Sequence, residues 1–407
     1  CFIQYEVPGM DILIFNTAVA DFRSSEFKFT EELAGPGGLA KCKTKDMPGY
    51  TQQQYRDWID KGMATAGGPG NTAPLAARAG LQVAVGVTLG KGEFGGLDAV
   101  GRMFYDAMTA NQVDMSQTRI HPTLGTGITF VYDKGNRERG GIAYFPNANN
   151  DIDFGDYRES VEKLKPRIVY YMYSGLSDKG DANGGRDLAD FMRWCKDRGI
   201  VTIADSHTLT REPEKLIRSG AAVPEYKLLE PLLPQLDIFF TSADEAQMIQ
   251  NTLGRAGRRA EGKAEDAIVH FLDFAAERFW GEDRGCRFFG VTVKDGAYEK
   301  HRLPDGVCSA AGKVRSRFLL GEVIDLVGAG DSFRAGVITY VARNIEEFKT
   351  GRMDFTEAIQ MGNLFASLYI KAPLQARYQY IQSYEQMLGV IRSRKTFGSF
   401  EELLQSI

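Results

Sequence analysis

Cysteine and histidine are scarce in this sequence, and their positions give no metal centre. The 407 residues include five cysteines and four histidines. No CxxC pair is present, no histidine stands at metal-ligand spacing from a cysteine, and an odd number of widely spaced thiols does not suit a disulfide framework. The cysteines therefore indicate reduced thiols: Cys1, Cys42, Cys195, Cys286 and Cys308.

Long apolar runs and an excess of basic charge are also missing. No run approaches the roughly 18 to 20 residues of a membrane span, and no stretch resembles a signal peptide. The formal net charge is -4, and no basic stripe supplies the clustered Lys and Arg side chains that nucleic acid requires. We therefore expect a cytoplasmic protein that binds a small molecule, with neither a membrane nor a nucleic acid as partner.

The composition predicts one large domain. Hydrophobic residues make up 43% and charged residues 25% of the chain, which is typical of a globular protein with a sizeable core. No Pro-, Ser- or Gly-rich linker divides residues 1–407, so we predict a single domain. Within it, segments 16–65 and 118–147 are expected to form a lid, and 373–407 a helical extension.

Short apolar runs rich in β-branched and aromatic residues alternate with helical patterns such as 186–199. The runs lack strict polar alternation, so they predict strands buried on both faces. Strand, helix and strand in turn predict an α/β fold with a mostly parallel sheet covered by helices. Segment 120–147 is typical of a hairpin and predicts a small β lid. The predicted strands are 11–15, 82–88, 167–173, 200–204, 236–240 and 287–293.

The stretch DLVGAGDSFRAG, residues 325–336, joins a small-residue turn to an apolar helical pattern. A helix start carries unpaired N–H groups and partial positive charge, and residues as small as Gly328, Ala329 and Gly330 let an anion approach them. Asp331 would repel that anion, unless its task is to take a proton from a hydroxyl that attacks the anion. The plainer interpretation is that Asp331 caps the helix.

A second small-residue turn, AGGPGNTAPLAARAG at 66–80, leads through Asn71 into another helix. Such a loop is a weak motif when it stands alone. With 325–336, however, it resembles the two signatures of the PfkB or ribokinase-like family of carbohydrate and nucleoside kinases, and the resemblance covers roughly residues 10–372. Leu326 is a departure, since Thr, Ser, Pro or Val is usual there. The matching residues are Ala66, Gly67, Pro69, Asn71, Ala73, Gly80 and Gly90, then Asp325, Gly328, Ala329, Gly330, Asp331, Ala335 and Gly336.

The resemblance implies a ribokinase-like three-layer α/β/α sandwich with a small β lid. It also implies transfer of phosphate from ATP to the primary hydroxyl of a small sugar. Asp331 would be the catalytic base, and the amides of Gly328 to Gly330 the anion hole. The acceptor would contact Asp21, Gly67, Gly68 and Asn71.

The same resemblance places ATP and Mg²⁺ on the other side of the site. Glu245 would help to hold magnesium through water, Ser242 and Thr292 would lie at the nucleotide, and Asn363 near the adenine. Asp325 could hold a monovalent cation such as K⁺. Plainer interpretations stay open: Asp21 could be a strand-end cap, Glu245 an exposed acid that begins a helix, Asn363 a buried polar group with its partner, and Asp325 the end of a strand.

Several positions depart from the family pattern. Ser242 stands where Asn is usual, and the nucleotide loop after Thr292 reads TVKDGA, one residue short and with Lys294 in place of a glycine. His207 and Leu209 stand where many sugar kinases of the family carry Asn and Arg.

Three functions stay open. A nucleoside kinase shares this fold and this catalytic base. The aromatic residues of segment 16–65 could stack a nucleobase, or they could equally form the core of the lid. A catalytically silent sugar-binding regulatory protein is the third. A dinucleotide-dependent oxidoreductase is disfavoured, because no GxGxxG follows the first strand. The lid is also a surface through which a homodimer could form. The aromatic residues are Phe22, Phe27, Phe29, Tyr50, Tyr55 and Trp58.

Overall fold

The central sheet confirms the predicted alternation of buried strands and helices. The computed structural model describes residues 9–35, 37–134, 139–254, 264–281 and 287–407. The six predicted runs supply six neighbouring parallel strands, and two antiparallel strands that the sequence analysis missed extend one edge. The order across the sheet is β15 (Gly312–Arg315), β14 (Gly296–His301), β13 (Phe288–Val293), β12 (Ile238–Ser242), β11 (Val201–Ser206), β10 (Ile168–Ser174), β1 (Ile12–Phe15) and β5 (Val83–Gly86).

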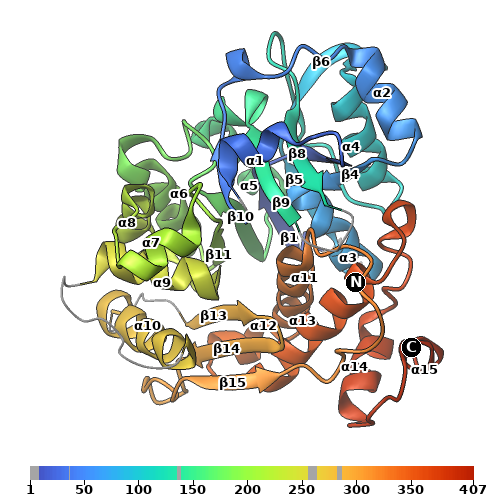
Figure 1. Ribbon diagram of the computed structural model, residues 1–407. Helices are drawn as coiled ribbons and strands as arrows, with labels where there is room; N and C mark the ends of the chain where they lie inside the picture. Colours follow the sequence, from blue (N-terminus) through green and yellow to red (C-terminus); the bar gives the residue numbers. More distant parts are fainter. Residues whose placement is uncertain (1–8, 36, 135–138, 255–263, 282–286) are drawn as a thin grey trace, which may run out of the picture.

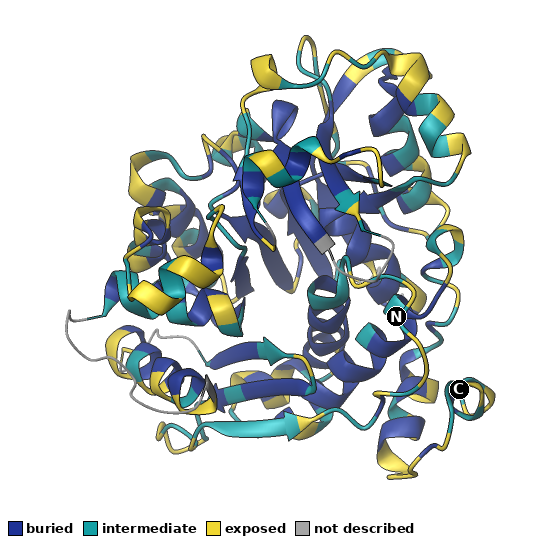
Figure 2. Cartoon of the chain, in the orientation of Figure 1, coloured by how far each residue is buried: buried dark blue, intermediate teal, exposed yellow. Residues whose placement is uncertain are grey.

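Both faces of this sheet are buried, because successive side chains of a strand point to opposite sides. In β1, Ile12 and Ile14 belong to one core cluster, whereas Leu13 and Phe15 belong to the other. Helices cover both faces and expose their outer sides (Figures 1 and 2), which makes a three-layer α/β/α fold. One face carries α3 (Ala73–Arg78), α11 (Ala329–Arg343), α12 (Ile345–Lys349), α13 (Phe355–Ile370) and α14 (Tyr384–Arg392); the other carries α5 (Phe154–Leu164), α6 (Arg186–Lys196), α7 (Pro213–Ser219), α8 (Leu229–Leu232), α9 (Ala243–Leu253) and α10 (Ala264–Phe279).

The predicted strand 82–88 is divided between two sheets. Its first part is β5, and its end begins β6 (Thr88–Phe94), which pairs with β7 (Arg119–His121) in a separate two-stranded sheet. At the break, Gly86 lies against the ring of Phe15, and a Cβ there would come within 2.5 Å of it. The continuous apolar run gave no sign of this change of sheet.

A second sheet of five strands is built from the segments predicted as the lid. The predicted hairpin is β8 (Gly127–Asp133) with β9 (Arg139–Phe145), which pair antiparallel. We call this sheet, with α1 (Phe29–Ala34) and α2 (Gln52–Asp60), the lid; it lies at the top of Figure 1, with α4 (Ala99–Thr109) beside it. The strand order is β3 (Leu39–Lys41), β9, β8, β2 (Val19–Ser24) and β4 (Ala64–Gly67).

The aromatic residues of the inserted segment form the core of the lid. Phe22, Phe27 and Tyr55 are almost fully buried, and their rings contact one another through Trp58 and Phe130. The sequence left two interpretations of these aromatic residues open, and the structure confirms that they form the core of the lid. They do not form a surface on which a nucleobase could stack.

The chain after α13 forms α14 and then α15 (Phe400–Gln405), which is consistent with a helical extension. Among the residues that the structure describes, no helix has the length and apolar character of a membrane span.

Candidate active site

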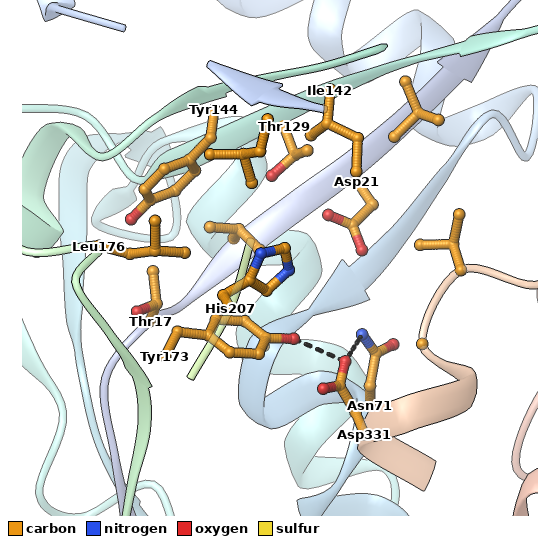
Figure 3. Close-up of a pocket in the computed structure, with 16 residues that line it drawn as sticks. Thr17, Asp21, Asn71, Thr129, Ile142, Tyr144, Tyr173, Leu176, His207 and Asp331 are labelled. Atoms are coloured by element: carbon orange, nitrogen blue, oxygen red, sulfur yellow. Dashed lines mark hydrogen bonds between the residues drawn. The ribbon is translucent and has the colours of Figure 1, made fainter. Parts of the chain in front are cut away.

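A small cavity lies between the lid, the glycine-rich turn after β4 and the first turn of α11. Its volume is about 80 Å³. The lid contributes the aliphatic side chains of Leu39, Val131 and Ile142 to its lining. Five residues of the predicted acceptor and catalytic site also line it (Figure 3): Asp21, Gly68, Asn71, Gly328 and Asp331. The remaining lining residues are Thr17, Val19, Thr129, Tyr144, Tyr173, Leu176, His207 and Val327.

Asp331 lies in the first turn of α11, and its side chain is buried. Its Oδ2 accepts hydrogen bonds from Asn71 Nδ2 at 3.0 Å and from the Tyr173 hydroxyl at 2.6 Å. Its Oδ1 accepts one from Arg334 Nη1 at 2.9 Å. The carboxylate is thus oriented from three sides, and Figure 3 shows it at the floor of the cavity, below Asp21.

Asn71 joins the two signature segments physically. It ends the short 3₁₀ helix Gly68–Asn71 and is 2% exposed. Its amide nitrogen donates to Asp331, and its amide oxygen accepts from the hydroxyl of Tyr369 on α13. Since each end of the amide has a partner, the side chain is fixed in one orientation.

Two glycines of the first turn leave room for their neighbours. A Cβ on Gly67 would lie 2.5 Å from Asp21 Oδ2, and one on Gly68 would lie 2.1 Å from the carbonyl oxygen of Thr17. Gly68 also has a φ of +58°, which side chains rarely adopt. The turn can therefore approach Asp21 only because both residues lack a side chain.

The second turn has the left-handed conformation that glycine favours. Gly328, the residue before α11, has a φ of +86°, and a Cβ there would come within 2.9 Å of Asn71. The amide of Ala329 donates to the carbonyl of Leu326 at 3.1 Å, so this amide closes the turn. The predicted anion hole then depends on the amides of Gly328 and Gly330.

Asp21 lies within the lid strand β2 rather than at the end of the first strand of the central sheet. It faces the cavity from above. Burial raises its pKa to about 6, Arg23 partly opposes this effect, and the Asp331 carboxylate adds to it. A hydroxyl between Asp21 and Asp331 would meet acceptors on both sides.

Two neighbours of Asp331 were missed in the sequence. Tyr173 has a φ of +59°, a strained conformation for such a side chain, and this aims its hydroxyl at Asp331. Burial and the Asp331 carboxylate raise the pKa of Tyr173 well above its usual value, so its hydroxyl keeps its proton. Arg334 lies one helical turn after Asp331. This spacing of three residues in the sequence could have predicted that the two side chains lie on the same face of the helix.

Asp325 is held by two guanidinium groups. Its carboxylate lies 2.8 Å from Arg23 Nε of the lid and also pairs with Arg377, which follows α13. Its Oδ1 accepts the amide of Val327 at 2.9 Å. Positive charge therefore already surrounds the carboxylate for which K⁺ was predicted, and these ion pairs weigh against a monovalent cation there.

Ser242, Glu245 and Thr292 lie close together at the carboxyl ends of β12 and β13, where α9 begins. Ser242 caps α9 and forms a reciprocal capping box with Glu245. Ser242 and Thr292 are opposite each other on β12 and β13. Glu245 thus lies in the first turn of the helix, but it is buried and not the exposed acid of the plainer interpretation; its predicted role toward magnesium stays a prediction.

The nucleotide predictions for Thr292 and Asn363 stay predictions. After Thr292 the chain makes a two-residue turn at Lys294 and Asp295 between β13 and β14, a tight hairpin in place of a longer glycine loop. Asn363 is buried on α13, where it donates to Gln360 of the same helix at 3.4 Å. It therefore has a partner of its own.

The residues around Glu245 suit a magnesium ion that is bound mainly by phosphate and water. Its carboxylate is surrounded by the hydroxyls of Ser206, Thr208 and Thr241. Mg²⁺ usually takes one or two carboxylates, with water and substrate phosphate completing its shell. Across the described ranges, no three His, Cys, Asp or Glu side chains gather into a metal site.

Comparisons with known proteins show relatives of the chain in sequence and in fold. The chain matches the model of the pfkB family carbohydrate kinases over residues 60–272 and 309–376, which is more than half of its length. A comparison with curated proteins gives no match.

Solved structures share the fold at low identity. An adenosine kinase from Anopheles gambiae, in complex with a diadenosine tetraphosphate, is 16% identical with a TM-score of 0.64, over 90% of this chain and 97% of that one. A fructokinase from Xylella fastidiosa with bound ATP is 17% identical with a TM-score of 0.62, over 94% and 98%. A candidate ribokinase II from E. coli, in complex with ATP and Mg²⁺, is 15% identical with a TM-score of 0.58, over 95% and 100%.

Proposed function

The chain belongs to the pfkB family of carbohydrate kinases, and we propose that it transfers the γ-phosphoryl group of ATP to the primary hydroxyl of a small sugar. The observation that carries this proposal is the position of Asp331. Its carboxylate lies at the start of α11, lines the cavity and is oriented by Asn71 and Tyr173.

In this proposal the acceptor lies between Asp21 and Asp331, with one hydroxyl against Asp331 Oδ2. Asp331 takes the hydroxyl proton while the hydroxyl oxygen attacks the γ-phosphorus. The bond from the γ-phosphorus to the oxygen that bridges to the β-phosphate breaks, and ADP leaves with that oxygen. The amides at the start of α11 stabilise the charge on the phosphoryl oxygens. Phosphoryl transfer needs mostly positioning and electrostatics. Magnesium bound near Glu245 would neutralise phosphate charge, while the lid keeps water from the reacting groups.

A nucleoside is a second candidate acceptor. The apolar wall of Leu39, Val131 and Ile142 favours it, because such a wall can cover a flat base more readily than a ring of hydroxyls. The aromatic residues of segment 16–65 form the core of the lid, so a base would pack on this aliphatic wall or against Tyr144 and Tyr173, which also line the cavity.

The test is a panel of sugars and nucleosides with ATP and Mg²⁺, read out as ADP release and as phosphorylated product. We expect one acceptor class to raise ADP release well above the rate without acceptor, and Asp331→Asn to abolish that increase. Near-normal turnover in Asp331→Asn would contradict the mechanism. Absence of transfer across the panel would favour the silent sugar-binding alternative. A cytoplasmic location and a homodimer through the lid stay predictions.

A further inference from the structure

Arg334 is a buried cation beside the proposed catalytic base. It lies on α11, one turn after Asp331, and is 5% exposed. Its Nη1 donates to Asp331 Oδ1 at 2.9 Å and lies 2.6 Å from Asp205 Oδ2 at the end of β11. A single guanidinium nitrogen thus joins two carboxylates from separate elements.

Burying these three charged groups is costly unless they compensate one another. Asp205 is fully buried, and burial raises its pKa to about 7 even though Arg334 lowers it. If Arg334 only connected α11 to β11, its ion pair with Asp205 would be enough, and it would not need Asp331 as a second partner. Here the guanidinium contacts the carboxylate to which the proposed reaction assigns the proton transfer.

The two oxygens of Asp331 consequently have different surroundings. Oδ1 faces the cation, whereas Oδ2 receives only the neutral donors of Asn71 and Tyr173. Figure 3 shows Oδ2, where the two dashed lines meet, on the cavity side of the carboxylate. The guanidinium is also close to the predicted anion hole, since a Cβ on Gly330 would lie 3.9 Å from its Cζ.

Arg334 is surrounded by acidic and phenolic groups from several elements. Beyond Asp331 on its own helix, these groups are Asp205 on β11, Tyr170 and Tyr173 on β10, and Glu245 on α9. Asp21 of the lid interacts with Asp331 across the cavity. Without Arg334, Asp205 and Asp331 would lose the guanidinium that they share, and two buried carboxylates without that cation favour their neutral forms.

We propose that Arg334 is the positioning residue of this site: its positive charge pairs with Oδ1 of Asp331 and leaves Oδ2 turned toward the acceptor hydroxyl. This inference rests on the proposed phosphoryl transfer. Arg334 acts through Asp331 and not on the acceptor, so its loss should change the pH dependence of turnover more than the KM for the acceptor.

The test compares Arg334→Met with Arg334→Lys, using the acceptor found in the panel and measuring kcat and KM from pH 5 to pH 9.5. We expect Arg334→Met to lose about 10²-fold in kcat near pH 7. The acid limb of its profile should move up by about one pH unit or more, so that alkaline pH restores part of the loss. Arg334→Lys keeps the charge and should keep the acid limb of the wild-type enzyme.

Arg343→Met is the matched control, because Arg343 is an exposed arginine of the same helix that contacts the carbonyl of Gly80. Its profile should be that of the wild-type enzyme. An equal loss of kcat at every pH in Arg334→Met, with an unmoved acid limb, would reduce Arg334 to a structural brace and overturn the inference.

Thermal unfolding separates the two proposals. With methionine at 334, the folded state favours the neutral carboxyls more than the unfolded state does, so the stability deficit of the variant should grow as pH rises from 5 to 9. Absence of transfer by the wild-type chain would refute the proposed function but leave this readout intact. A deficit that is the same at both pH values would then refute the pairing of charges.

Discussion

Asp325 and Asp331 come from one stretch of the chain, yet their surroundings make them different groups. Asp325 is paired with the guanidinium groups of Arg23 and Arg377, which join the lid and the segment after α13 to this loop. Asp331 has a single guanidinium, which it shares with Asp205, and its other oxygen has only neutral donors.

The difference teaches that the number of cations around an acid decides which contacts its oxygens have left to make. Two guanidinium groups hold Asp325 and make it a joint between three parts of the molecule. Asp331 shares one guanidinium with Asp205 and keeps an oxygen with only neutral donors beside the cavity, which is the oxygen that the proposed reaction uses. Four variants can break or sharpen this contrast.

The largest effect is expected for Asp331→Asn. We expect turnover to fall by roughly 10²- to 10⁴-fold, because the base is lost, while acceptor binding measured by calorimetry changes little. The thermal midpoint should shift less than in the Asp325 variant. Comparable losses of turnover in the two variants, corrected for the folded fraction, would erase the contrast.

Asp325→Asn should act on stability. It removes the carboxylate charge that pairs with the guanidinium groups of Arg23 and Arg377, and breaking such an arrangement costs about 3 to 5 kcal/mol. Urea unfolding measures this loss, and Asp305→Asn, at an exposed loop acid, is the matched control. If the free energy of unfolding of Asp325→Asn equals that of the control, the ion pairs of Asp325 with Arg23 and Arg377 do not stabilise the fold.

Asp21→Asn tests the acid that faces Asp331 across the cavity. Burial raises the pKa of Asp21 in the folded protein to about 6. Its ionised form therefore lowers the free energy of unfolding by the full amount above that pH. Below about pH 4 the carboxyl is protonated in both the folded and the unfolded state, so there is no such loss of stability. The variant should therefore be more stable than wild type at pH 8, by on the order of 2 kcal/mol, and equal to it at pH 4. A difference that does not vary with pH would contradict this account.

Tyr378→Phe probes the segment after α13 with the smallest change. The Tyr378 hydroxyl donates to the carbonyl of Gly70 at 2.8 Å, next to Asn71. We expect a loss of about 1 kcal/mol in unfolding free energy, measured by urea titration. Tyr380→Phe, whose ring packs on Phe400, should be close to neutral, and equal losses in the two variants would show that the hydroxyl bond contributes nothing.

Much of the fold could be predicted from local pattern. Strands buried on both faces, such as β1 and β10, produce unbroken apolar runs, and the two glycine turns carry recognisable residues at fixed spacing. The sequence also predicted the meeting of Asn71 and Asp331, because the family resemblance places both in one site.

The charged partners could not be predicted in the same way. Arg334 is a charged residue within a predicted helix, and its sequence neighbours do not show whether it faces solvent or the interior. Its contact with Asp205 on a distant strand could therefore not be predicted. Arg377 lies just beyond the region that matches the family, and Tyr173 adopts a left-handed backbone for which its residue type gives no signal. These contacts arise only when distant segments are packed together.

The position of Arg377 also sets the order in which the site is completed. Both signature turns, the base and its hydrogen-bonding neighbours precede it in the chain. During synthesis those parts can fold on emerging from the ribosome, but the second guanidinium on Asp325 arrives only afterwards. A chain cut before residue 377 would keep every signature residue and still lack one of the two guanidinium groups that hold Asp325, the other being that of Arg23 in the lid.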